Sequence, residues 1–207
     1  SFGSRPGRLI VFLLGGLWYL FGGGLALAAD GVRERLADAP LLRGDFEQTK
    51  HLQGFRNPLK SSGHFLLVRD QGAQWDTRQP FPSLTILTRD RLLSKLPDGQ
   101  TRMTLNGEAS PALAAINSLL LALLAGDVDA LAEQFSSSET LLDEGAWTLK
   151  LRPRETALAR LILGIELSGD RYVRHLVIEE HSGDRTEITF SAITDSSTLS
   201  AEEASRF

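Results

Sequence analysis

Residue types that carry catalysis or bind metals are few and scattered in this chain of 207 residues. The chain has no cysteine, and its histidines show no metal-ligand spacing: His51, His64, His175 and His181. Asp127 and Asp129 lack the glycine and the distal glutamate of a calcium loop, so helix capping is the better interpretation. Glu179 and Glu180 point to opposite faces of a predicted strand, and no serine stands in a G-x-S-x-G motif. We therefore expect a protein that is not an enzyme and needs no cofactor or metal.

Arg69 is the polar residue whose predicted position most suggests a function. Alternation along 62–69 places it on the same strand face as Phe65 and Leu67. A guanidinium among apolar side chains is costly unless its five donors find carbonyls or a carboxylate. Backbone carbonyls at the end of a helix predicted at 110–124 are candidate partners, and Arg69 would then act as a latch on that helix. The alternative is an arginine at a strand end that reaches water, which the following Asp70 would allow.

The helix predicted at 110–124 is unusually apolar. Pro111 suits its first position, and Gly126 follows its end. Between them stand leucine, isoleucine and alanine, with Asn117 and Ser118 as the polar residues. A helix that is apolar almost all round must be buried or must face something apolar, and this one is too short to cross a bilayer.

The rest of the chain predicts mostly strands, identified by alternating polarity and by turn residues between them. The predicted strands are 42–48, 62–69, 73–77, 84–88, 91–96 and 100–105, then 139–142, 147–151, 159–168, 171–180 and 185–193. Shorter helices are predicted at 30–39 and 127–135. We expect an α+β fold that is mainly β: an incomplete antiparallel β-barrel, or strongly curved sheet, with the 110–124 helix as a lid over its concave face.

Residues 1–29 are expected to be an export signal. Arg5 and Arg8 precede a long apolar run, which ends in small residues just before Asp30. An uncleaved membrane anchor is the alternative, because the run is long enough to span a bilayer. Either interpretation predicts a domain in the periplasm, the second with the domain tethered to the inner membrane.

The remaining chain is expected to form one domain over 30–195, followed by a flexible tail at 196–207. The net charge of −4 argues against binding to nucleic acid, whose phosphates need basic patches. Without cysteine, stability must come from burial and backbone pairing alone. We expect a monomer.

An ordered set of motifs in the first half resembles the LolA family of periplasmic lipoprotein carriers. The set consists of Phe46-Glu47-Gln48, Gly63 with alternating apolar residues to Arg69, Trp75, and Gln79-Pro80 before the next strand. The family usually has a proline where this chain has Asp70 and an aromatic residue where it has Ala73, so the chain resembles a divergent member.

The resemblance implies an incomplete β-barrel closed by a helical lid, with Arg69 in the position of the latch. It also implies binding of lipoprotein acyl chains or another envelope lipid, a loading complex at the inner membrane and a receptor at the outer membrane. The side chains expected to contact lipid are Phe46, Phe65, Leu67, Trp75, Leu113, Ile116, Leu120 and Leu124. A non-catalytic periplasmic scaffold for glycolipid or polyketide assembly, tethered or free, is the second hypothesis.

Overall fold

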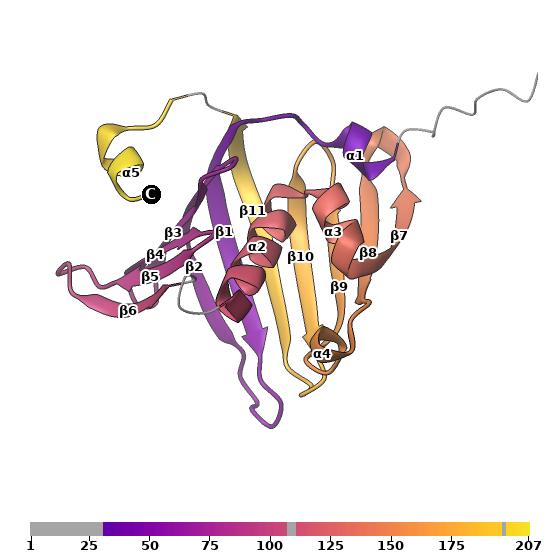
Figure 1. Ribbon diagram of the computed structural model, residues 1–207, viewed down its shortest axis with the longest axis horizontal. Helices are drawn as coiled ribbons and strands as arrows, with labels where there is room; N and C mark the ends of the chain where they lie inside the picture. The colour runs from indigo at the N-terminus through magenta and orange to yellow at the C-terminus, as the bar shows by residue number, and fades with distance from the viewer. Residues whose placement is uncertain (1–30, 107–110, 196–197) are drawn as a thin grey trace, which may run out of the picture. The chain divides into compact units, whose positions relative to one another are not determined.

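The computed structural model describes residues 31–106, 111–195 and 198–207, and it contains an antiparallel sheet of 11 strands (Figure 1). The strands before the main helix are β1 Leu41–His51, β2 Leu59–Val68, β3 Gly72–Gln79, β4 Ser83–Thr88, β5 Arg91–Lys95 and β6 Thr101–Asn106. Those after it are β7 Phe135–Leu141, β8 Trp147–Pro153, β9 Ile162–Gly169, β10 Val173–Glu180 and β11 Arg185–Asp195. The signal or anchor predicted at 1–29 lies outside the described residues. Within the described ranges, no helix has the length and apolarity to cross a membrane.

The sheet consists of two meanders joined along one seam. Strands β1 to β6 follow one another in space, as do β7 to β11, and β1 pairs with β11 between them. At that seam Phe46 lies opposite Phe190. The sheet is curved, and it does not close because β6 and β7 end the strand order without pairing with each other. The predicted incomplete antiparallel barrel is confirmed.

Helix α2, Pro111–Ala125, lies against the concave face of the sheet and is called the lid helix below (Figure 1). Its end is a Schellman motif: Gly126 N donates to Leu123 O at 3.3 Å, and Asp127 N donates to Ala122 O at 2.9 Å. Gly126 has φ +64°, a conformation that favours glycine. The Asp127 side chain then caps α3, Val128–Gln134, by accepting a hydrogen bond from Ala130 N. Both helices were predicted, as was the capping role of Asp127.

The ends of several elements differ from prediction. Helix α1 covers only Val32–Arg35, because Ala37 N bonds to Arg171 O at 2.7 Å and the chain leaves the helix there. Strand β7 begins at Phe135, earlier than expected; its exposed serine-rich sequence lies at the sheet edge and shows no alternation. A turn of helix, α4 at Thr156–Ala159, and a 3-10 turn at Asp143–Gly145 were not predicted.

Residues 198–207 correct the prediction of a flexible tail. They form α5, Ala201–Ser205, whose capping box joins Ser200 and Glu203. Leu199 and Phe207 pack on a separate cluster formed by Leu41, Leu66 and Val68. The small polar sequence concealed this arrangement, because the segment takes its stability from the sheet rather than from its own apolar pattern.

Candidate functional site

Four rings from different strands form an aromatic cluster at the seam of the sheet: Phe46, Phe65, Trp75 and Phe190. Phe46 and Trp75 stack with ring centroids 4.0 Å apart, and Phe65 meets the edge of Phe190 at 5.3 Å. Antiparallel pairing of β1 with both β2 and β11 brings the strands together, and alternation puts the rings on one face. The cluster is a broad apolar wall inside the curve of the sheet.

The lid helix packs against this interior on two sides. Leu119 and Leu123 are buried in the main core with Leu149, Leu167 and other side chains of β8 to β11. Leu120, Leu121 and Leu124 contact a second group on the other half of the sheet, formed by Leu67, Ala73 and Leu87. This position explains why the helix is apolar all round: opposite faces of it meet opposite halves of one curved sheet.

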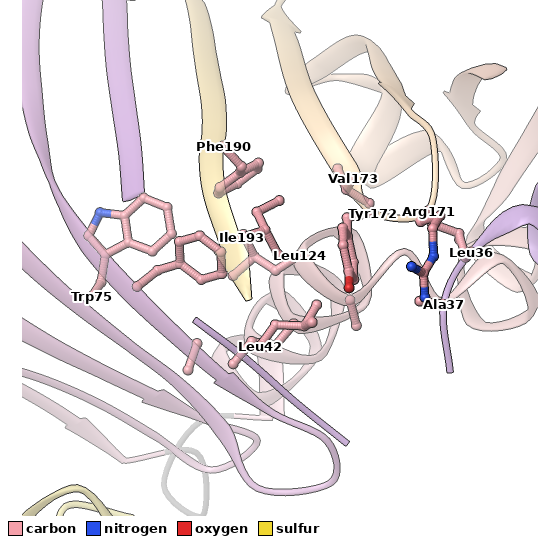
Figure 2. Close-up of a pocket in the computed structure, with 14 residues that line it drawn as sticks. Leu36, Ala37, Leu42, Trp75, Leu124, Arg171, Tyr172, Val173, Phe190 and Ile193 are labelled. Atoms are coloured by element: carbon pink, nitrogen blue, oxygen red, sulfur yellow. The ribbon is translucent and has the colours of Figure 1, made fainter. Parts of the chain in front are cut away.

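A small cavity of about 30 Å³ remains between the lid helix and the sheet. Its lining is mainly apolar and includes Leu42, Phe65, Trp75, Leu124, Val173 and Phe190. Figure 2 shows Trp75 and Phe190 on one side of it, and Tyr172 and Val173 across from them. The space suffices for only one or two water molecules, so Leu124 and its neighbours leave little room at this point.

Asn117 is a buried polar residue on the lid helix, with 1% of its surface exposed. Its Nδ2 donates to Thr88 O, at the end of β4, at 3.1 Å. Its Oδ1 has no hydrogen-bond partner among the described residues. A buried acceptor without a partner costs about 1–3 kcal/mol, so the lid helix is held in the hollow by a contact that is only half satisfied.

Arg69 makes different contacts from those expected of a latch. Its Nη1 lies 2.5 Å from Asp38 Oδ1, and its Nη2 donates to Ala39 O at 3.3 Å. Among the described residues no hydrogen bond joins Arg69 to the lid helix, although Arg69 and Ala125 line the same surface hollow. Arg69 therefore fastens the segment between α1 and β1, and it lies beside the last turn of the lid helix without bonding to it.

The turn between β9 and β10 borders the cavity and is held by Asp170. Its backbone oxygen accepts from Trp147 Nε1 at 2.7 Å, and its carboxylate accepts from Arg174 Nε at 3.1 Å. Burial opposes ionisation of this carboxyl, but the bonds from Arg174 and from Tyr172 N outweigh burial and lower the pKa of Asp170. The ionised carboxylate fixes Tyr172 beside the hollow.

The structure brings most of the predicted lipid-contacting side chains together on the concave face: Phe46, Phe65, Leu67, Trp75, Leu120 and Leu124. Leu113 and Ile116 belong to the lid helix, but their side chains lie outside the described residues. The sequence interpretation missed Leu42, Val173 and Phe190, which line the same cavity. Phe190 alternates inward on β11 and Leu42 shares a strand face with Phe46, so both were detectable, whereas Val173 reaches the cavity only through tertiary packing. Contact of any of these residues with lipid stays a prediction.

His51, His64 and His175 lie on strands β1, β2 and β10, and His181 lies in the turn after β10. His64 Nδ1 lies 2.5 Å from Asp45 Oδ1 across the β1–β2 pair, and both side chains are well exposed. In the described ranges, no group of three or more His, Asp or Glu side chains is arranged to hold a metal ion.

An open antiparallel sheet with an apolar helix in its concave face defines a lidded, incomplete β-barrel. A family model described as "Outer membrane lipoprotein carrier protein LolA" matches residues 38–204. The chain therefore belongs to the LolA family.

Comparison with solved structures gives distant matches. A LolA superfamily protein from Nitrosomonas europaea is 7% identical, with a TM-score of 0.42 over 81% of this chain and 91% of that one. A domain described as an outer-membrane lipoprotein-sorting protein from Vibrio parahaemolyticus is 10% identical, with a TM-score of 0.41 over 83% and 92%. A chain of the MucA/MucB complex of Pseudomonas aeruginosa is 15% identical, with a TM-score of 0.43 over 83% and 58%. No curated protein matches the sequence.

Proposed function

We propose that this protein is a periplasmic carrier that takes acyl chains of lipoproteins, or of another envelope lipid, into the hollow under the lid helix and delivers them to an outer-membrane acceptor. The observation that carries the proposal is the lid helix itself, whose apolar side chains occupy the concave face and leave about 30 Å³. An acyl chain and the lid side chains would compete for the same space. Membership in the LolA family supports the same role.

Exchange of the lid side chains for an acyl chain sets two burial free energies against each other. Full burial of one leucine is worth about 1.5–3 kcal/mol, so the buried Leu119 and Leu123 together account for roughly 3–6 kcal/mol, and the partly buried Leu120, Leu121 and Leu124 add less each. One acyl chain of about 15 methylenes would gain roughly 12 kcal/mol if fully enclosed. Because cargo must displace these side chains, the net free energy of binding is smaller than the gain from enclosing the acyl chain alone. A carrier needs this balance, since complete enclosure without competition would prevent release.

Two partners follow from this mechanism: a loading complex at the inner membrane and a receptor at the outer membrane. Acyl chains cannot cross water unprotected, so each transfer must occur between two apolar sites in contact. The carrier acts through binding and release, with no chemical step on its cargo.

The test is native mass spectrometry of the full chain purified from the periplasm without detergent, followed by solvent extraction of any bound lipid. We expect a fraction of the protein to carry an acylated species that disappears in Leu124→Arg. Leu142→Arg is the matched control, because Leu142 is an exposed leucine away from the hollow. Both variants are first compared by thermal unfolding, and a well-folded Leu124→Arg that keeps its lipid contradicts the proposal. Protein that is free of lipid but copurifies with an assembly enzyme favours the scaffold hypothesis instead.

A further inference from the structure

The loop between β1 and β2 holds large apolar side chains in solvent. Phe55 is 72% exposed and Leu59 is 59% exposed. The loop has a defined turn, in which Phe55 N donates to Leu52 O at 3.1 Å and Gly54 has φ +85°. These side chains are therefore presented by an ordered tip rather than packed into the core.

This hairpin is braced at its base and projects past the neighbouring strand ends (Figure 1). Gln53 N donates to Asp184 Oδ1 at 2.8 Å, which ties the hairpin to the turn between β10 and β11. Immediately before this, His51 pairs with Arg185 across the seam. The tip is thus a fixed protrusion at one end of the strands.

The charge of the hairpin is opposite to that of the whole chain. No acidic residue occurs between Glu47 and Asp70, whereas Lys50, Arg56 and Lys60 all lie within that stretch. None of these three has an ion pair among the described residues, while Arg78 and Arg185 on neighbouring strands pair with carboxylates. The hairpin therefore carries three cations without ion pairs in the part of the chain that the structure describes, and it lies beside a β10–β11 turn that holds Glu180 and Asp184.

Other apolar side chains are exposed at the same end of the strands. Phe81 is 80% exposed in the turn after β3, and Gln79 at the end of β3 pairs with Ser62 of β2. On the other side of the hairpin, Leu161 is 66% exposed, and its oxygen accepts from His181 N at the β10–β11 turn. Exposed Phe and Leu thus occur in several loops at the same end of the strands as the hairpin tip.

From this combination we infer that the tip of the β1–β2 hairpin docks onto the surface of a bilayer that contains anionic phospholipid. Phe55 and Leu59 enter the region between headgroups and acyl chains, while Arg56 and Lys60 contact lipid phosphates. A protruding tip without a matching groove suits a deformable surface better than a shaped protein pocket. Basic side chains near an anionic surface add to this attraction, each by about fivefold in partitioning.

The experiment uses a dye on a single introduced cysteine, because the chain has none of its own. Asn57→Cys places the dye in the exposed loop and keeps Phe55 and Leu59, and Thr140→Cys on exposed β7 is the matched control. Each labelled full-length protein is titrated with vesicles of phosphatidylglycerol and phosphatidylcholine, and with phosphatidylcholine alone. We expect a blue shift only at position 57, stronger with the anionic vesicles and weaker at high salt.

Two variants of the labelled Asn57→Cys protein separate the contributions. Phe55→Ser should abolish the blue shift, and Arg56→Gln with Lys60→Gln should weaken anionic binding about 25-fold. An equal response at position 140 means that another part of the chain tethers the protein, and this overturns the inference. It is likewise overturned if position 57 responds to an acidic protein but to neither kind of vesicle. These outcomes do not depend on whether the hollow under the lid helix holds lipid, which is measured separately.

Discussion

Asn117 and Thr88 make a one-sided contact between the lid helix and the sheet: Asn117 Nδ2 reaches Thr88 O at 3.1 Å, and Asn117 Oδ1 finds no partner among the described residues. The hydrogen bond gives register to an apolar helix that could otherwise slide along the hollow. The unpaired acceptor at the same time lowers the stability of the closed position. Under the proposed carrier function, in which the lid opens to admit cargo, both effects are useful.

Replacing Asn117 by leucine is expected to strengthen the closed lid. The change removes an orphan acceptor that costs about 1–3 kcal/mol and loses a bond worth about 0.5–1.5 kcal/mol. We expect the unfolding midpoint to rise by about 2–4 °C and uptake of a fluorescent fatty acid to fall. Ser118→Leu is the control, since Ser118 is half-buried at the outer side of the same helix. A lower midpoint for Asn117→Leu would contradict this view of the contact.

Gly126 should be sensitive to substitution for two reasons. Its φ of +64° disfavours any other residue, and an added Cβ would lie 3.0 Å from side-chain atoms of Leu36 and Val173. Gly126→Ala is expected to destabilise the protein by about 1–2 kcal/mol or more. Gly145→Ala is the matched control, because Gly145 has φ +79° with open space around it. Chemical denaturation of both variants gives the comparison, and an equal loss would mean that packing at the lid end contributes nothing.

Arg69→Leu tests the latch hypothesis in its revised form. Since Arg69 and Asp38 form a mostly exposed pair, we expect a loss of stability below about 1 kcal/mol. If Arg69 also restrains the last turn of the lid helix, release of a bound acyl probe should change more than its capture. Asp38→Asn removes the ion pair but keeps Arg69 beside the helix. Identical release kinetics for Arg69→Leu and the unmodified protein would rule out a latch.

Trp75 should report entry of an acyl chain. It stacks on Phe46 and borders the cavity, whereas Trp147 is buried and bonded to Asp170 O. We expect a short-chain lysolipid to shift the tryptophan emission, and Trp75→Phe to abolish the shift while retaining an aromatic ring. In Trp147→Phe the shift should remain. Loss of the shift in both variants would place the bound lipid elsewhere.

The docked C-terminal segment should loosen in acid. The bond from Arg43 is the main cause that lowers the pKa of Glu203 below its ordinary 4.5. A lowered pKa in the folded state stabilises the segment above pH 4.5, and this contribution is lost as the pH falls through the folded value. Hydrogen exchange of α5 amides, corrected for the intrinsic rate, should show protection that falls as the pH drops below 4.5. In Arg43→Gln, protection should be weak at neutral pH already.

Several features of the protein could be predicted from local sequence. Alternation identified nearly every strand, and Pro111 with Gly126 marked both ends of the lid helix. Apolar residues on nearly all sides of that helix indicated that it is buried or faces something apolar. The ordered motifs around Phe46 and Trp75 indicated the family that the comparison confirms.

Tertiary structure alone decided which partners these elements acquired. The sequence suggested that Arg69 bonds to the lid helix. In the structure, the segment before β1 brings Asp38 and Ala39 within reach, and the guanidinium bonds to these acceptors instead. The sequence likewise indicated only that residues 198–207 are small and polar. In the structure, Arg43 and the cluster around Leu66 provide the surface on which this segment folds. Local patterns fix which face of an element is apolar, because that depends on spacing along the chain. Contacts between distant segments depend on the path of the whole sheet, which no local window contains.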